Sequence, residues 1–175
     1  MSRGRLAPLF IGASMDYLWT PWRYQYVTKP EDAGVCIFCA AAQSSDDART
    51  LVVHRGAHNF VILNRYPYCS GHVMVVPYQH VATLEELPEE ALDELIRLGR
   101  DCEKHLRAAY KPDGLNLGIN LGKSAGAGIA GHLHLHVLPR WTGDTNFMTV
   151  VGETRVVPET LEITWEKLRG AFAGE

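Results

Sequence analysis

The chain has 175 residues, of which 46% are hydrophobic and 21% charged, and its formal net charge is −3. This length and composition are typical of one globular domain with a core of ordinary size. The negative net charge argues against nonspecific nucleic-acid binding, and no apolar run approaches the roughly 20 residues that a membrane-spanning helix requires.

The N-terminal region divides into an arm and the start of the folded body. Residues 1–15 carry two arginines and only a short apolar patch, a poor match to a signal peptide, so we expect a flexible arm and a cytoplasmic location. Residues 17–24 form an aromatic cluster too large to leave in water, and we expect it to pack on the body or at a subunit interface. We therefore predict a single domain over residues 16–175.

Two cysteines at Cys-x-x-Cys spacing, Cys36 and Cys39, come next. In a reducing compartment this pair indicates a metal or redox site rather than a disulfide. A structural zinc needs four ligands, and His80 and His132 are the best candidates for the other two. The redox alternative is weaker because no thioredoxin-like βαβ pattern surrounds the pair. Chance spacing is the remaining alternative.

The central part of the chain reads as strands, one long helix and further strands. A capping box at residues 83–86 precedes an apolar pattern of helical period, which predicts a helix from about 88 to 110. Apolar runs predict strands over residues 51–55, 60–64, 71–77 and 115–120, the first two joined by a turn at Gly56. This order of elements favours an α+β fold with an antiparallel sheet.

Residues 123–131 form a glycine-rich loop before the last predicted strand. Its glycines, among them Gly126 and Gly128, let a ligand approach the backbone closely, and successive N–H groups there can bind an anion. Many such loops are only turns. The position directly before a cluster of histidines favours a phosphate site.

That cluster is the most informative feature of the sequence. His132, His134 and His136 alternate with Leu133 and Leu135, which predicts a strand with all three imidazoles on one face, roughly 6.5–7 Å apart. Two kinds of site fit the pattern: a three-histidine metal site, or a phosphate site in which one histidine attacks phosphorus. A straight strand brings three rings to one ion only awkwardly, which disfavours the first.

The run 131–140 (GHLHLHVLPR) resembles the signature of the histidine triad (HIT) superfamily of nucleotide hydrolases and transferases. Residues 60–67 and 71–77 resemble the nucleoside-binding hairpin of that family. Residues 18–23 and 140–148 are similar to a narrower branch that contains bacterial diadenosine tetraphosphate phosphorylases. The resemblance implies a HIT-like fold, with an antiparallel sheet, one long helix, a short C-terminal helix and a C-terminal extension.

The resemblance also implies roles for single residues. His134 matches the family nucleophile, which attacks the α-phosphorus and forms a covalent nucleotidyl-histidine, and His136 matches a phosphate contact that helps the leaving group. A nucleophilic histidine must be neutral, with its far nitrogen held by an acceptor such as a backbone carbonyl. The resemblance assigns zinc to Cys36, Cys39, His80 and His132, the ribose to Asn64 and the phosphate side to Asn120.

The sequence departs from the family at one place. Many members carry Ser, Thr or Gln three or four residues before the first histidine of the row, where this chain has Ile129 and Gly128. A side-chain hydrogen bond to the α- or bridging phosphate is therefore missing. We expect Ser124, or backbone N–H groups of the loop such as those of Gly126 and Gly128, to replace it.

The expected function is phosphorolysis or hydrolysis of dinucleoside polyphosphates such as diadenosine tetraphosphate. The long tail after Asn146 favours it, since the small phosphoramidase-type members end soon after their histidine row. Hydrolysis of nucleoside phosphoramidates or adenylylated compounds is one alternative, and a purine-nucleotide-binding module with little turnover is another. By analogy we expect a homodimer formed through the long helix and adjoining sheet, with Mg²⁺ on the substrate phosphates and no membrane partner.

Overall fold

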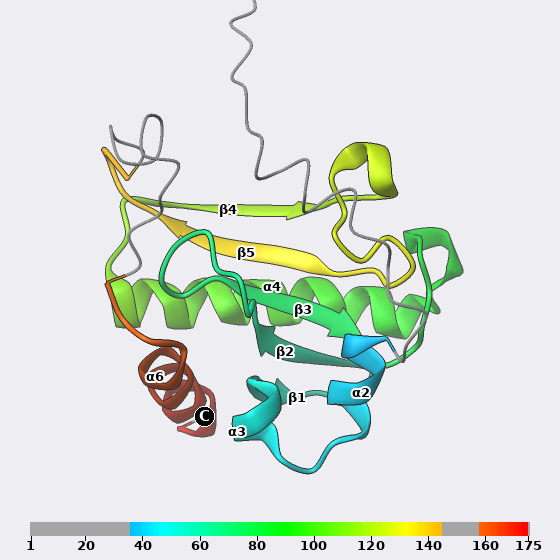
Figure 1. Ribbon diagram of the computed structural model, residues 1–175, viewed down its shortest axis with the longest axis horizontal. Coiled ribbons are helices and arrows are strands. Elements are labelled where there is room, and N and C mark those ends of the chain that lie inside the picture. Colours follow the sequence, from blue (N-terminus) through cyan, green and yellow to red (C-terminus); the bar gives the residue numbers. More distant parts are fainter. Residues whose placement is uncertain (1–35, 145–157, 175) are drawn as a thin grey trace, which may run out of the picture.

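A computed structural model describes residues 36–144 and 158–174. Their core is a five-stranded sheet of strand order β1-β2-β3-β5-β4, in which every neighbouring pair is antiparallel (Figure 1). The strands are β1 (Val52–Arg55), β2 (Asn59–Leu63), β3 (Val73–Pro77), β4 (Gly114–Ile119) and β5 (Leu135–Arg140). The predicted α+β class is confirmed, and the four strands predicted before the histidines are present with small shifts at their ends.

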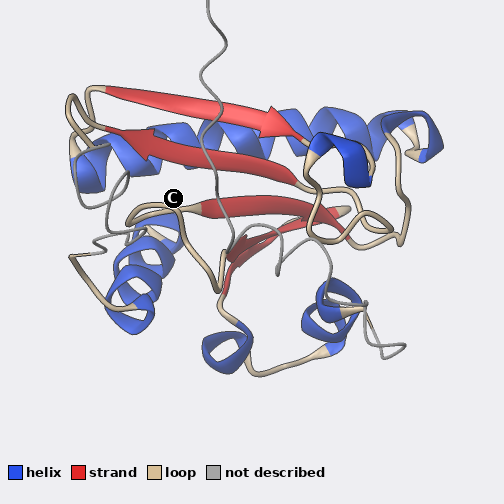
Figure 2. Ribbon diagram, turned by 45° about the horizontal axis from the view of Figure 1, so that its top comes forward, coloured by secondary structure: helices blue, strands red, loops and turns tan. Residues whose placement is uncertain are grey.

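The long helix α4 (Glu89–Tyr110) runs behind the sheet in Figures 1 and 2. Its buried side includes Leu95, Cys102 and Leu106, the helical period seen in the sequence, whereas Ile96 is 59% exposed. Gly99 lies where the helix meets β5, because a Cβ there would come within 3.0 Å of the Leu135 side chain. The predicted capping box is present, but it starts the 3-10 turn η1 (Leu84–Glu86), one turn before α4.

Three shorter helices gather near the β1 edge: α2 (Ile37–Gln43), α3 (Asp47–Thr50) and α6 (Leu161–Ala173). The last is the predicted short C-terminal helix, and it packs on both α4 and β1. Its Trp165 Nε1 donates a hydrogen bond to the Val52 carbonyl at 2.7 Å, and Phe172 stacks on the ring of His54 and meets that of His105 at a tilt.

The histidine row does not begin as a strand, contrary to the prediction. Strand β5 starts only at Leu135, so His132 and His134 precede it. In the β3–β5 ladder Val75 pairs with Leu135, and in that register Leu133 would face Pro77, which has no N–H to donate. The Leu133 N–H instead donates to the carbonyl of Val81 at 2.7 Å.

Several predictions concern residues outside the described segments, namely the arm at 1–15, the aromatic cluster at 17–24 and the tail directly after Asp144. The domain limits therefore stay predictions. In the described segments no helix combines the length and the apolar character that crossing a membrane demands.

Candidate active site and metal centre

His134 lies just before β5 and is 5% exposed. Its Nδ1 is 2.8 Å from the main-chain carbonyl oxygen of His132. Because a carbonyl only accepts, the neutral ring carries its proton on Nδ1 and has a lone pair on Nε2. Burial lowers the pKa of His134, although the bond to the carbonyl opposes the shift. The ring is therefore held neutral, in the tautomer that a nucleophile requires.

His136, on β5, has the opposite tautomer. Its Nδ1 lies 2.9 Å from Nε2 of His72, whose Nδ1 accepts the Tyr68 main-chain N–H at 3.2 Å. His72 Nδ1 is thus an acceptor, so in the neutral ring the proton sits on Nε2 and is donated to His136. His136 Nδ1 then carries the lone pair and its Nε2 the proton. Burial first, and then His134, lowers the pKa of His136 to about 4.

The rings of His134 and His136 meet edge to face, with centroids 4.8 Å apart and an interplanar angle of 78°. The two rings are closer together than the roughly 6.5–7 Å predicted for same-face residues of a strand. His134 itself precedes the regular strand. One ring offers a lone pair and the other an N–H donor. Gly118 faces His136 across the β4–β5 ladder, and the absence of a side chain leaves open space there.

His72 is the residue that sequence reasoning missed. It is 1% exposed and lies in an apolar run, where a histidine reads as part of the core. The feature that could have identified it is its position two residues before Met74, which pairs with His136 across the β3–β5 ladder. Residues two apart on a strand share a face, so the register places His72 beside His136.

Cys36, Cys39, His80 and His132 come together, as predicted, with their ligand atoms all within 4.8 Å of one another. Cys36 Sγ and Cys39 Sγ lie 3.4 and 3.7 Å from His132 Nδ1, and Cys39 Sγ lies 3.2 Å from His80 Nδ1. A tetrahedral zinc with two sulfur and two nitrogen ligands has ligand–ligand separations of about 3.3–3.8 Å. The donor set suits zinc, and these three separations are close to those of such a site.

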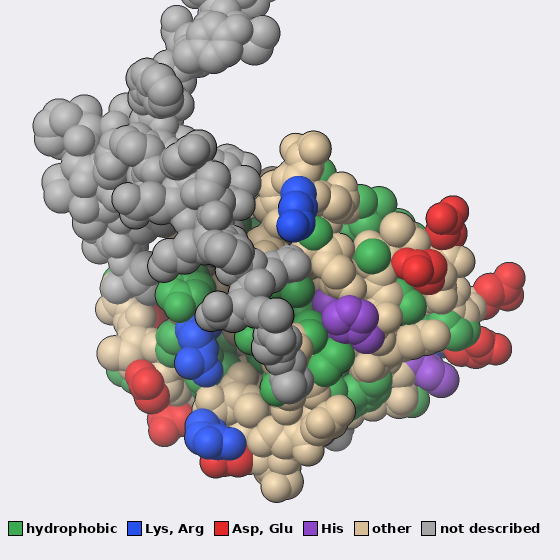
Figure 3. All heavy atoms as spheres, turned by 45° about the vertical axis from the view of Figure 1, so that its right-hand side comes forward, with side chains coloured by type: hydrophobic (Ala, Val, Ile, Leu, Met, Phe, Trp, Pro, Cys, Tyr) green, Lys and Arg blue, Asp and Glu red, His purple; other side chains and the backbone are tan. Residues whose placement is uncertain are grey.

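Two further features of this cluster favour a cation. His132 Nε2 lies 2.9 Å from the carbonyl oxygen of Pro77, which fixes Nδ1 as the nitrogen free to bind a metal. Burial raises the pKa of the Cys39 thiol, and Cys36 raises it further, a cost that a bound cation reverses. His80 is the exposed member of the cluster, and Figure 3 shows histidine side chains at the surface.

The geometry argues against the three-histidine metal site. The His132 ring faces the cysteines, while His134 and His136 each commit Nδ1 to another partner. Phe38, 1% exposed, touches both the His132 and the His134 rings, with centroids 5.3 and 5.2 Å away. The rings of the row therefore do not converge on one point: His132 joins the cysteine cluster, while His134 and His136 face each other.

Two of the predicted nucleotide-binding residues directly follow strands of the sheet: Asn120 comes after β4 and Asn64 after β2. Ile119, the residue before Asn120, pairs with Leu135, the residue after His134. The Asn64 N–H donates to the His72 carbonyl at 3.0 Å, and its side-chain oxygen accepts from the Tyr66 N–H at 2.9 Å.

The glycine-rich loop forms the turn η2 (Lys123–Ala125), where Ser124 is exposed. Gly126 has φ +90°, and its N–H donates to the Lys123 carbonyl at 2.9 Å within the turn. Gly128 is exposed in the same loop, after the turn.

Comparison with known proteins gives a consistent result. The family model described as HIT domain matches residues 46–143. The chain is 41% identical over 167 residues to an AP-4-A phosphorylase of Mycobacterium tuberculosis, covering 91% of this chain and 85% of that protein.

Among solved structures, a Zn-bound histidine triad family protein from Mycobacterium smegmatis is similar at 32% identity and a TM-score of 0.64, over 79% of this chain and 94% of that one. A hypothetical histidine triad nucleotide-binding protein from Sulfolobus tokodaii matches at 29% identity and a TM-score of 0.63, over 79% and 93%. The chain therefore belongs to the HIT domain family and is an enzyme of that family.

Proposed function

We propose that this enzyme cleaves dinucleoside polyphosphates, such as diadenosine tetraphosphate, by transferring a nucleotidyl group through His134 to phosphate or water. The observation that carries the proposal is the pair of opposite tautomers: a lone pair on His134 Nε2 beside an N–H on His136 Nε2. The similarity to an AP-4-A phosphorylase supports the substrate class.

In the first step the His134 Nε2 lone pair forms a bond to the α-phosphorus, and the bond from that phosphorus to the bridging oxygen breaks. The ring keeps its Nδ1 proton, and the His132 carbonyl stabilises the positive charge that the ring acquires. His136 donates its Nε2–H to the bridging oxygen as negative charge develops there. With a pKa of about 4 it is neutral at pH 7 and acts as a hydrogen-bond donor.

In the second step an oxygen of phosphate or water attacks the same phosphorus, and an attacking water releases its proton to the solvent. The bond between nitrogen and phosphorus breaks and its electron pair returns to His134 Nε2. We expect Asn120, Ser124 and the N–H of Gly128 to contact the phosphates and Asn64 the ribose. Gly126, whose own N–H is bonded to the Lys123 carbonyl, would let the phosphates approach the backbone closely. The one role that we propose for Mg²⁺ is to bind the substrate phosphates as their counter-ion.

We propose that Cys36, Cys39, His80 and His132 hold a structural zinc ion. The ion would tie α2 to the segment after β3 and to the start of the histidine row, and so keep the His132 carbonyl in place beneath His134. Zinc has no part in the transfer itself. We also propose a cytoplasmic location, since in a reducing compartment a cysteine pair binds metal rather than forming a disulfide.

We also propose a homodimer formed through α4 and the adjoining β4. Ile96 on α4 is 59% exposed and Leu117 on β4 is 48% exposed, and a Cβ at Gly99 of α4 would lie 3.9 Å from the Leu117 side chain. Exposed apolar side chains that lie together are typical of interfaces. Sedimentation analysis of the wild type and of Leu117→Glu tests this, and a monomeric wild type contradicts it.

The test of the activity is a product analysis with diadenosine tetraphosphate and Mg²⁺, with and without inorganic phosphate. ATP plus ADP formed only with phosphate identifies a phosphorylase, and ATP plus AMP without it identifies a hydrolase. Two ADP molecules formed without phosphate would contradict attack at the α-phosphorus. Absence of products despite nucleotide binding would overturn the proposal and favour a phosphoramidase or a binding module.

A further inference from the structure

Both cysteines of the metal cluster belong to α2, a helix of only seven residues. Cys36 is its N-cap residue and Cys39 lies in its first turn. No side chain caps the N-terminus by a hydrogen bond, and the last turn contains no basic residue. A helix this short does not form by itself in water, so contacts from elsewhere must order the segment that presents the two thiols.

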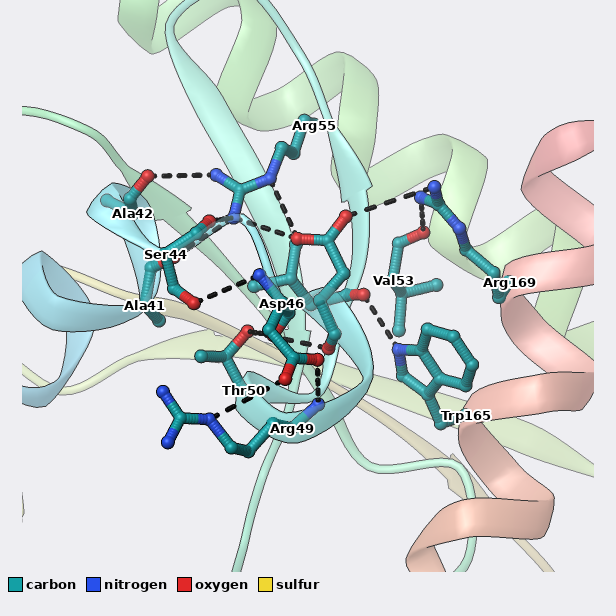
Figure 4. A network of polar contacts seen from close by, with 12 residues as sticks. Ala41, Ala42, Ser44, Asp46, Arg49, Thr50, Val53, Arg55, Trp165 and Arg169 are labelled. Atoms are coloured by element: carbon teal, nitrogen blue, oxygen red, sulfur yellow. Dashed lines mark hydrogen bonds and ion pairs between the residues drawn. The ribbon is translucent and has the colours of Figure 1, made fainter.

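Arg55, on β1, makes those contacts at the C-terminal end of the helix (Figure 4). Its Nη1 donates to the Ala42 carbonyl at 3.0 Å, and its Nη2 donates to the carbonyls of Ala41 at 3.0 Å and Ser44 at 2.7 Å. The last carbonyls of a helix have no partners within it and carry its partial negative charge. The Arg55 guanidinium both donates hydrogen bonds to these carbonyls and offsets the partial negative charge.

The guanidinium is itself held in place. Its Nε donates to a carboxylate oxygen of Asp47 at 2.9 Å, and these side chains are only 27% and 20% exposed. The other oxygen of Asp47 lies 3.9 Å from Arg169 of α6, which also donates to the Val53 carbonyl at 2.9 Å. Figure 4 shows the guanidinium enclosed between the end of α2 and α3. Because the Arg55 and Asp47 side chains are mostly buried, solvent screens their charges only in part.

The other end of α2 is anchored by Phe38, which is 1% exposed and packs on the rings of His132 and His134. The helix is therefore fixed at each end by a contact that involves no metal. The cysteine Sγ atoms already stand at zinc-like distances from His80 and His132.

We propose that Arg55 is the positioning residue of the metal centre: it orders α2 before the metal arrives and thereby sets the affinity for zinc. The inference rests on the proposed zinc site. When only a fraction of molecules has the binding-competent arrangement, the apparent affinity falls by that fraction. Loss of a residue that orients metal ligands typically weakens binding by about 10- to 100-fold.

We therefore expect Arg55→Met to weaken zinc binding by about 10- to 100-fold. Arg55→Lys keeps the charge but offers one nitrogen, whereas the guanidinium bonds three carbonyls and a carboxylate. The zinc affinity of this variant should therefore lie between that of the wild type and that of Arg55→Met. Arg49→Met is the matched control. It removes one positive charge from the neighbouring α3, where Arg49 is 79% exposed and pairs only loosely with Asp46 at 3.7 Å.

The measurement is competition for zinc between the full-length protein and a chromophoric chelator of known affinity, for the wild type and the three variants. Loading with Co²⁺ gives a second reading, because the visible spectrum reports tetrahedral thiolate coordination. The expected result is weaker binding in both Arg55 variants and unchanged binding in Arg49→Met. Thermal melts confirm that each variant is folded, and if Arg55→Met is not, Arg55→Lys and Asp47→Asn decide the question.

Two outcomes would overturn the inference in distinguishable ways. A wild-type protein that binds neither zinc nor cobalt would remove the metal centre itself, and this proposal with it. A wild type that binds zinc, together with Arg55 variants of equal affinity, would refute the role of Arg55 alone. An equal loss in Arg49→Met would attribute the effect to net charge and would also refute it.

Discussion

His72 Nε2 donates to His136 Nδ1 across the β3–β5 ladder, over a distance of 2.9 Å. Through this bond a residue outside the histidine row decides which nitrogen of His136 faces the substrate. The main-chain N–H of Tyr68 fixes the direction of the chain of hydrogen bonds, since it leaves His72 no choice of tautomer.

Replacement of His72 by Met should therefore lower kcat roughly 10- to 100-fold with little change in KM, because His136 is free to take the wrong tautomer. His72→Gln, whose amide can donate to His136 and accept from Tyr68, should recover most of the rate. Ring ¹⁵N chemical shifts of His136 report the tautomer directly. Equal rates in the Met and Gln variants would show that His72 only fills space.

His134→Ala should lower turnover by on the order of 10³-fold or more while nucleotide binding and the melting temperature stay close to wild type, because the nucleophile is lost. Equilibrium binding of a non-cleavable dinucleotide and single-turnover kinetics measure the two effects separately. Residual activity near wild type would exclude His134 as the attacking group.

Removal of zinc with a strong chelator should lower the melting temperature, and Zn²⁺ but not Mg²⁺ should restore it, because Mg²⁺ prefers oxygen ligands. Cys36→Ser should reproduce the loss with less metal bound, whereas Cys102→Ser, in the core away from the cluster, provides the comparison. Metal analysis of freshly purified protein gives the stoichiometry. A metal-free wild type with unchanged stability would refute the site.

Glu94 predicts a pH dependence of stability. Its carboxylate accepts main-chain N–H bonds from Ala57, His58 and Asn59 at 2.7–2.8 Å and one from the Asn59 amide at 2.9 Å. Burial raises the pKa of this carboxyl, but these bonds, the Asn59 side chain foremost, outweigh it and hold the pKa below its ordinary value of 4.5. The unfolded chain therefore takes up the proton first as the pH falls.

Glu94→Gln should cost roughly 2 kcal/mol at pH 7, because a charged acceptor of several bonds is lost. The stabilisation is present above pH 4.5, the ordinary value, and is lost progressively as the pH falls from there through the lower pKa of the folded state, so the difference from wild type should shrink below pH 4.5. Urea unfolding at pH 7, 5 and 4 measures this, with the exposed Glu90→Gln as control. A difference independent of pH would point to packing instead of charge.

The docking of α6 should depend on Phe172, which is 8% exposed and contacts the rings of His54 and His105 with centroids 4.9 and 4.2 Å away. Phe172→Ala should cost roughly 3 kcal/mol of unfolding free energy, as for other buried aromatic truncations. Ile163→Ala on the same helix, where the side chain is 50% exposed, should cost less than about 0.5 kcal/mol. Equal costs would show that the helix is not anchored through Phe172.

Periodicity was enough to predict α4 and the strands before the histidines, because burial on one face leaves a regular pattern. It failed at the start of β5. The alternation of His and Leu continues back to His132, but in the register of the β3–β5 ladder Leu133 would face Pro77, and no local pattern in the histidine row reveals what lies opposite. Donor chemistry predicted the four members of the metal cluster, since only a few cysteines and histidines were available to complete it.

His72 was missed for the same reason as the strand start. Its role depends on register, a relation between two strands 64 residues apart, and not on anything adjacent in the chain. Arg55 is comparable: a single arginine in a strand is unremarkable until the carbonyls of Ala41, Ala42 and Ser44 are found around it.

The hydrogen bonds from Trp165 and Arg169 to the carbonyls of Val52 and Val53 have a consequence for assembly. They cap two carbonyls of β1 and so hinder the addition of a further strand there, whereas among the described residues β4 ends the sheet on the other side with β5 as its one neighbouring strand. Within the part of the chain that the structure describes, strand addition is thus favoured at the β4 margin. Two copies joined through β4 would use up both open margins, and growth into a longer fibre would stop at two.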